Sequence, residues 1–215
     1  MNYKNIVLAS VVSAASLTTS VYANTTKPSL DKNGIKVWTI HNPNNPIVSY
    51  RAETIVDTTI ERAAGLILDV NYAASWVPYL KRVDLMARDD KKGEYQLYMV
   101  LDFPFPLTDR DLVLQTRTYR DSKGTIFIKN KAAPQLKAKS NEFVRLNKYE
   151  GDWTFQKTAD NKVKITTTGY ADPEGVIPLS VSNLFVKQQP YLMLQKMKVE
   201  LQKNRKMPPL PEALR

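Results

Sequence analysis

Residues 94–120 read EYQLYMVLDFPFPLTDRDLVLQTRTYR, two stretches of alternating side chains joined by a link with two prolines. Apolar side chains recur at every second position of the first stretch: Tyr95, Leu97, Met99, Leu101 and Phe103. The second stretch, Asp111–Arg120, carries Leu112, Leu114, Thr116 and Thr118 on one side. Because successive side chains of a β-strand point to opposite faces, this spacing predicts two strands that are each apolar on one face.

The same alternation extends over most of the chain. It predicts further strands at Lys36–Ile40, Ser49–Val56 and Val163–Tyr170, and around Ile126, Val144 and Trp153. Each of these strands is apolar on one face only. That pattern indicates an antiparallel sheet with one face in water.

An early segment shows helical spacing instead. Asp57 precedes Thr58-Thr59-Ile60-Glu61, which reads as a Thr-x-x-Glu capping box that opens a helix through about Val70. Apolar side chains repeat along it at Ile60, Ala63, Ala64, Ile67 and Leu68. Pro78 is expected to end the short helix that follows.

The last element is long, Leu179–Lys203. Its main stripe at helical spacing consists of Val181, Leu184, Phe185, Gln188, Leu192, Gln195 and Val199. Leu194, Met197 and Leu201 form a second apolar set on the opposite side, and Pro190 is expected to kink the helix. One long helix against one curved antiparallel sheet is an α+β arrangement.

Two glutamines interrupt the main stripe of this helix. A buried polar side chain without a partner costs about 1–3 kcal/mol, so Gln188 and Gln195 need hydrogen bonds if the stripe is buried. The head group of a ligand would supply them, and so would backbone carbonyls of neighbouring strands. Both interpretations are open at this point.

Composition excludes several kinds of chemistry. The 215 residues contain no cysteine and one histidine, His41, which excludes disulfides and thiolate sites and nearly excludes a histidine metal centre. We expect no catalytic residue, metal or cofactor. The net charge of +10 suits either an anionic phospholipid surface or simple solubility. Nucleic acid is not an expected partner, because the chain has no basic block with stacking aromatics.

The first residues have the pattern of an export signal. Lys4 precedes an apolar stretch, Ile6–Leu17, and Val21-Tyr22-Ala23 fits a signal-peptidase site. We therefore expect a signal peptide at 1–23 and a periplasmic protein. The expected layout continues with a loose segment at 24–34, one domain at 35–204 and a proline-rich tail at 205–215.

Three segments carry a resemblance to a known family. They are Phe103–Val113, with its aromatic-proline run and Arg-Asp pair, Asp172–Pro178, which reads Asp-Pro-x-Gly-x-Ile-Pro, and Val70–Pro78. Together, across roughly Ile35–Lys203, they resemble the START family, the lipid-transfer domains related to the steroidogenic acute regulatory protein. The resemblance implies the helix-grip fold, a curved antiparallel sheet wrapped around a long C-terminal helix with an internal apolar cavity.

The resemblance also implies where a ligand binds. The expected ligand-binding side chains are Leu97, Met99, Leu101, Leu114, Thr116, Ile165, Thr167, Leu184, Phe185, Gln188, Leu192 and Gln195. Some relatives carry a buried charged pair in the tunnel. The corresponding strands here show no charge on the apolar face, which favours a more apolar ligand contact.

A gate loop is expected from Phe103, Phe105, Arg110 and Asp111. The segment Asp109-Arg110-Asp111 reads either as a polar latch at the tunnel mouth or as a structural ion pair at the start of a strand. Phe103–Pro106 reads either as a hydrophobic gate that touches membrane or as a rigid turn with buried aromatic rings.

The resemblance implies non-catalytic binding and transfer of a phospholipid, fatty acyl lipid, sterol or isoprenoid. The positive charge favours transient contact with anionic membranes, and we expect a monomer. The alternatives are a helix-grip enzyme, similar to a cyclase or dehydratase, acting on a small aromatic or polyketide-like substrate, and a lipid sensor that performs no transfer.

Overall fold

The computed structural model describes residues 27–42, 45–175 and 177–215. The predicted signal peptide, 1–23, lies outside the described residues. The described residues form a ten-stranded sheet. Its strands are β1 (Leu30–Lys32), β2 (Ile35–Asn42), β3 (Asn45–Val56), β4 (Leu80–Asp89), β5 (Glu94–Leu101), β6 (Arg110–Arg120), β7 (Ile126–Ala132), β8 (Val144–Arg145), β9 (Tyr149–Lys157) and β10 (Val163–Ala171).

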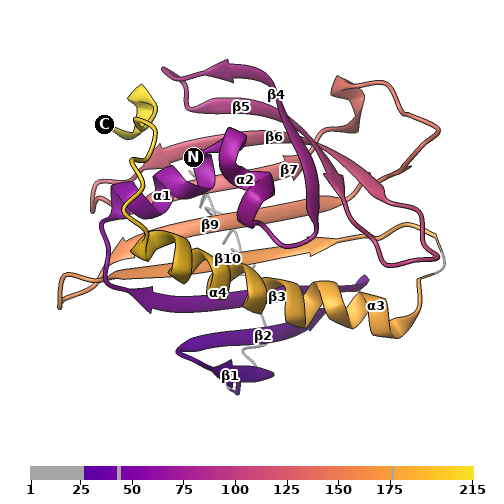
Figure 1. The fold of residues 1–215 in the computed structure, drawn as a ribbon, viewed down its shortest axis with the longest axis horizontal. Helices are drawn as coiled ribbons and strands as arrows, with labels where there is room; N and C mark the ends of the chain where they lie inside the picture. The colour runs from indigo at the N-terminus through magenta and orange to yellow at the C-terminus, as the bar shows by residue number, and fades with distance from the viewer. Residues whose placement is uncertain (1–26, 43–44, 176) are drawn as a thin grey trace, which may run out of the picture.

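The strand order is β1-β2-β3-β10-β9-β7-β6-β5-β4, and short β8 pairs with β6. Pairing is antiparallel along the whole path and parallel only between β6 and β8. Leu97 of β5 lies opposite Leu114 of β6, which places the two apolar faces quoted above on the same side. The predicted α+β fold with a curved antiparallel sheet is confirmed (Figure 1).

Helices cover one face of this sheet (Figure 1). They are α1 (Ile60–Leu68), α2 (Val70–Trp76), α3 (Leu179–Asn183) and α4 (Gln189–Gln202). α4 packs on β2 and β3, α1 on β9 and β10, and α2 on β4. The main core lies between the helices and the sheet, where Ala64 of α1 and Leu194 of α4 meet sheet residues such as Phe155. Within the described part of the chain, no helix is long and apolar enough to cross a membrane.

The N-terminus of α1 differs by one residue from the prediction. Thr59, not Thr58, is the N-cap, and its side chain accepts a hydrogen bond from the backbone N–H of Arg62. Glu61 therefore lies in the first turn, but not at the third helical position, from which a capping-box glutamate bonds back to the N-cap residue. The Thr-x-x-Glu pattern matches Thr58 alone, since Arg62 stands three residues after Thr59, but either threonine hydroxyl can serve as an N-cap.

The segment after Asp172–Pro178 is not one regular helix. Between α3 and α4 lies a π-helical stretch, η2 (Leu184–Gln188). A π-turn inserts an extra residue, and each residue of a helix rotates the side-chain direction by about 100°. Apolar positions before and after η2 therefore do not share a face. The buried face of α4 carries Leu194, Met197 and Leu201, whereas Val199, predicted as buried, is 53% exposed.

Pro190 lies in the first turn of α4, directly after η2. The helical segments α3, η2 and α4 follow one another without a gap, and Leu184 and Gln188 at their junctions have right-handed helical φ and ψ. A proline inside a helical run removes one backbone hydrogen bond, and the irregular π-helical stretch lies immediately before it.

The sheet does not have one fully wet face. On the side opposite the helices, residues 133–145 cover part of β5 and β6. Tyr98, Val100 and Val113 form a small second core there with Leu136 and Phe143. A one-sided sheet is therefore the wrong description for this half of the molecule, since apolar side chains at alternate positions on both faces are buried.

Both ends of the domain pack against the sheet. In the segment 24–34, expected to be loose, Leu30–Lys32 pairs with β2 as β1. In the predicted tail, Glu212–Leu214 forms a 3-10 turn, η3, and Leu214 is fully buried in the main core. Arg120 Nε donates to the carbonyl of Leu214 at 3.0 Å, which fastens the tail to β6.

Candidate functional site

A cavity lies between α2, α4 and the concave face of the sheet, with a volume of about 120 Å³. Strands β4 to β7 and β9 form its floor, α2 forms one wall, and Met193 of α4 contributes to another. The lining residues are Ile67, Leu68, Val70, Ala73, Trp76, Val77, Leu80, Val83, Tyr95, Leu97, Met99, Leu114, Thr116, Ile128, Asn130, Tyr149, Trp153 and Met193. Most of these are aliphatic or aromatic, so the cavity presents an apolar surface.

A small polar group interrupts the apolar floor. Thr116 Oγ1 donates to Asn130 Oδ1 at 2.7 Å, and Asn130 Nδ2 donates to the carbonyl of Gly151 at 2.6 Å. Asn130 lies opposite Thr116 on β6 and opposite Gly151 on β9. The central strand β7 thus holds the amide in a defined orientation through both of its neighbours.

Tyr149 reaches the cavity because of a glycine. A Cβ atom on Gly151 would lie 2.2 Å from the Tyr149 hydroxyl oxygen, so only a residue without a side chain leaves room for this ring. Burial raises the pKa of the Tyr149 hydroxyl well above its usual range, and burial raises the pKa of Tyr95 to about 12. Both tyrosines are therefore uncharged at neutral pH.

The link between β5 and β6 joins the cavity region to the loop before α3. Arg110 is buried, and its guanidinium carbon lies 4.2 Å from the ring centroid of Phe103. Its nitrogens donate to the carbonyls of Thr108, Pro173 and Glu174. One side chain therefore connects two segments far apart in the sequence.

Aromatic packing extends this connection to η2. The rings of Phe103 and Phe185 stack with centroids 4.4 Å apart, and Tyr79 approaches Phe185 at 5.7 Å. Phe105, two residues further along the link, is 97% exposed. Asp109 also fixes the link, since its carboxylate accepts hydrogen bonds from Lys81 Nζ at 2.7 Å and from the N–H of Phe103 at 3.0 Å.

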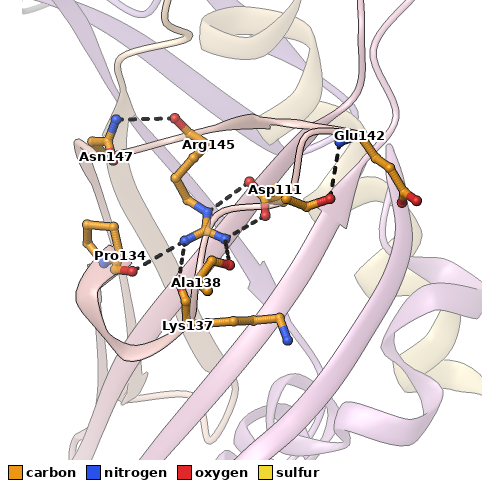
Figure 2. Close-up of polar contacts among 8 residues, drawn as sticks. Asp111, Pro134, Lys137, Ala138, Glu142, Arg145 and Asn147 are labelled. Atoms are coloured by element: carbon orange, nitrogen blue, oxygen red, sulfur yellow. Dashed lines mark hydrogen bonds and ion pairs between the residues drawn. The ribbon is translucent and has the colours of Figure 1, made fainter.

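Asp111 is three positions from Leu114 of the cavity lining on β6, so its side chain points to the opposite face of the sheet, where it is fully buried. There it pairs with Arg145 (Figure 2). Arg145 Nε and Nη2 each donate to one carboxylate oxygen of Asp111 at 2.8 Å. The same guanidinium donates to the carbonyls of Pro134, Lys137 and Ala138. This bidentate pair therefore holds residues 133–145 on the outer face of the sheet.

Comparison with known proteins identifies the family. The family model for the START domain matches residues 27–207. The chain belongs to the START domain family. An uncharacterized Pseudomonas aeruginosa protein is 24% identical over 174 residues, which is 81% of this chain and 85% of that one. The human phosphatidylcholine transfer protein is 23% identical over 164 residues, with 74% and 75% covered.

A solved structure confirms the fold of this START domain. The crystal structure of the STAR-related lipid transfer protein from Xanthomonas axonopodis superposes with a TM-score of 0.75. The two sequences are 24% identical, and the match covers 82% of this chain and 98% of that chain. The helix-grip resemblance inferred from the sequence is therefore correct.

The START domain brings four of the predicted ligand-binding residues to the cavity: Leu97, Met99, Leu114 and Thr116. The other eight predicted ligand-binding residues do not line the cavity. Leu101 packs in a neighbouring cluster with Leu112 and Leu146. Ile165 and Thr167 are buried in the core, and Leu184, Phe185 and Leu192 are half-buried and outside the cavity lining.

The two glutamines are the clearest correction. Gln188 and Gln195 are exposed and do not line the cavity, so neither needs a ligand or a carbonyl as a partner. The prediction placed them on a buried stripe that the π-helical stretch interrupts. Of the expected gate residues, Phe103, Phe105 and Arg110 lie together on the link, whereas Asp111 forms the structural ion pair on the opposite face.

Sequence reasoning missed several lining residues that carry polar atoms, among them Trp76, Asn130 and Tyr149. For Asn130 a signal existed: in Ile126–Ala132 the inward positions are Ile126, Ile128, Asn130 and Ala132, so one amide lies on an otherwise apolar face. The Gly151 that admits Tyr149 stands in the middle of a strand, a position typical of close approach by another group. Trp76 precedes Pro78 and gave no such signal.

Proposed function

We propose that this START domain binds one hydrophobic lipid in the cavity and carries it between membranes without changing it chemically. The observation that carries the proposal is an apolar cavity between the helices and the concave face of the sheet. Burial of apolar tail surface contributes about 25 cal/mol per Å², so a few hundred Å² retain a lipid. The names of the human and Xanthomonas relatives, which refer to lipid transfer, support the same function.

The size of the cavity requires an opening step. Pockets for drug-sized ligands usually measure about 300–1,000 Å³, several times the volume present here. Cargo entry must therefore separate parts of the wall. We expect the separation where η2 meets the β5–β6 link, because Phe185 and Phe103 join them mainly by side-chain stacking.

We propose that the link between β5 and β6 also contacts the membrane. Phe105 presents an almost fully exposed ring between two prolines, which limit how far the backbone can rearrange to hide it. The net charge of +10 favours approach to anionic lipid surfaces. We propose that Phe105 inserts into the bilayer interface while the adjacent wall opens.

We also propose that the protein is exported to the periplasm after cleavage behind Ala23 and acts there as a monomer. N-terminal sequencing of the protein from a periplasmic extract tests the cleavage site. Light scattering on the purified mature protein tests the oligomeric state. An uncleaved N-terminus or a stable dimer would contradict these two proposals.

Native mass spectrometry combined with lipid extraction tests the binding proposal. Protein purified without detergent is expected to carry one lipid per chain. Met99→Trp fills the cavity and is expected to abolish this lipid, whereas Leu85→Trp, on the exposed part of β4, is a matched control that retains it. A wild-type protein without lipid, which also takes up none from vesicles, would contradict the proposal.

Transfer between donor and acceptor vesicles tests the membrane step. Phe105→Asp is expected to slow transfer about tenfold while the bound lipid remains in the protein. Anionic vesicles are expected to accelerate wild-type transfer, and salt to reduce this effect. Equal transfer by Phe105→Asp would exclude the link from membrane contact.

A further inference from the structure

The lining of the cavity carries no charge among the described residues. Asp, Glu, Lys, Arg and His are all absent from the side chains that form it. The two buried arginines of the described residues are engaged elsewhere: Arg110 with backbone carbonyls and Phe103, and Arg145 with Asp111 on the outer face. A phosphate or carboxylate in the cavity would therefore be buried without a counter-ion, which is strongly unfavourable.

The indole N–H of Trp76 requires a hydrogen-bond acceptor. The Trp76 side chain lines the cavity and is 2% exposed, and its indole nitrogen is buried with no hydrogen-bond acceptor among the described residues. Buried polar groups in native proteins nearly always have a partner. An indole N–H donates and never accepts, so the missing partner must be an acceptor such as a carbonyl or hydroxyl oxygen.

The floor of the cavity is compatible with such an oxygen. Thr116 and Asn130 satisfy each other and the carbonyl of Gly151, and both keep unused capacity: the Thr116 hydroxyl oxygen as an acceptor and the second Asn130 N–H as a donor. Tyr95 and Tyr149 are uncharged. The free Asn130 N–H can therefore donate to a carbonyl or hydroxyl oxygen of a ligand, and the Thr116 oxygen can accept from a ligand hydroxyl, with no change of charge in either side chain.

We infer that the cavity selects an uncharged lipid group with a carbonyl or hydroxyl oxygen, which accepts a hydrogen bond from Trp76 Nε1. This inference rests on the proposed lipid-binding function and narrows it. Neutral acyl esters and long-chain alcohols meet this chemical requirement. Lipids that must place a charged head group in the cavity do not.

A matched set of probes tests the inference. Methyl oleate has an uncharged carbonyl, octadecene has a similar chain without oxygen, and oleate has a carboxylate that is ionised at alkaline pH. Each is supplied in radiolabelled form in phosphatidylcholine vesicles, and its partition into delipidated full-length protein is measured. The variants are Trp76→Phe, which keeps an aromatic ring but removes the donor, and Trp38→Phe, on β2 and outside the cavity lining.

Wild-type protein is expected to bind methyl oleate about tenfold more tightly than octadecene, as one added hydrogen bond allows. Ionised oleate is expected to bind at least tenfold more weakly than methyl oleate. Trp76→Phe removes the preference for methyl oleate over octadecene, and Trp38→Phe retains it. Thermal unfolding of both variants verifies that they are folded.

A second readout follows the indole itself. The protein has three tryptophans, so ¹⁵N-labelled protein gives three indole N–H resonances, and the one missing in Trp76→Phe belongs to Trp76. This resonance is expected to shift downfield with methyl oleate and not with octadecene. Equal binding of oleate and methyl oleate, or a Trp76 resonance that does not respond, would overturn the inference while lipid binding stands. Binding of none of the probes would overturn the proposed function and the inference together.

Discussion

The guanidinium of Arg110 covers the ring of Phe103 at 4.2 Å and at the same time donates to the carbonyls of Pro173 and Glu174. Arg110 is the first residue of β6, and Pro173 and Glu174 lie on the loop that leads to α3. The contact therefore joins the link that carries Phe105 to the loop before the final helices. Two of the three segments that resemble the START family meet through this one side chain.

Replacement of Arg110 tests whether this connection restrains cargo. Arg110→Gln is expected to lower the free energy of unfolding by about 1–3 kcal/mol and to release bound lipid several times faster, because buried carbonyls lose charged donors. Arg82→Gln is the control, since Arg82 also lies over an aromatic ring, Tyr98, but is largely exposed. Urea unfolding and stopped-flow lipid release measure the two effects. An unchanged release rate in a destabilised Arg110→Gln would limit Arg110 to a structural role.

The pair Asp111–Arg145 is expected to be the most sensitive ion pair among the described residues. Asp111→Asn leaves a buried guanidinium without its counter-ion, which typically costs about 3–5 kcal/mol. Asp31→Asn removes the exposed partner of Lys36 and is expected to change stability by less than about 1 kcal/mol. Urea denaturation compares the two variants. Similar losses in both would show that burial does not strengthen the pair.

Glu200 is expected to make stability depend on pH. Burial by itself would raise the pKa of this carboxyl, but hydrogen bonds from Lys203 and Tyr72 outweigh it and hold the pKa below the usual value. A depressed pKa in the folded state adds stability above the unfolded pKa, and this stability disappears as the pH falls through the folded pKa. Glu200→Gln is therefore expected to cost about 1 kcal/mol near neutral pH and to match wild type in acid. A difference that stays constant in urea titrations from neutral to acidic pH would exclude this linkage.

Gly151 and Tyr149 are expected to behave as a coupled pair. Gly151→Ala forces the Tyr149 ring out of position, because the new methyl group would overlap the hydroxyl. A loss of about 1–3 kcal/mol in stability and weaker lipid binding are expected. In the Tyr149→Ala background the same substitution should cost less, and a double-mutant cycle measures the coupling. Additive effects would mean that the ring does not depend on the glycine.

Neighbouring residues of α4 test which face of the helix is buried. Leu194→Ala removes a fully buried side chain and is expected to cost about 2–5 kcal/mol. Gln195→Leu, at the next, exposed position, is expected to change stability by less than about 0.5 kcal/mol and to leave the bound lipid unchanged. Lipid extraction and thermal unfolding measure both. An altered lipid content in Gln195→Leu would show that Gln195 does contribute to lipid binding.

Strand positions were predictable because alternation is a local property. Tyr95, Leu97 and Met99 point to one side of any extended chain, and the structure places all three at the cavity. The same argument did not predict that the outer face of the sheet is partly covered. Tyr98 and Val100 are also apolar at alternate positions, and burying them requires a segment that packs on that face. That segment, residues 133–145, is held by Arg145, whose pairing with Asp111 depends on a contact across 34 positions of the chain.

The capping register and the helix face were less predictable. Thr58 and Thr59 present the same hydroxyl chemistry, and the glutamate three residues after Thr58 pointed to the wrong one of the two. The glutamines of the last segment follow helical spacing if the helix is regular, and the π-helical stretch Leu184–Gln188 breaks that regularity. Local spacing contains no information on where such an extra residue is inserted.

The sequence by itself determined the antiparallel sheet, the early and final helical segments and the likeness to the START family, because periodicity and short motifs are properties of neighbouring residues. Only the tertiary structure decided that Trp76, Asn130 and Tyr149 meet in one uncharged cavity and that Gln188 and Gln195 lie in water. Those outcomes depend on the register between elements far apart in the chain, and that register is set by packing of the whole core.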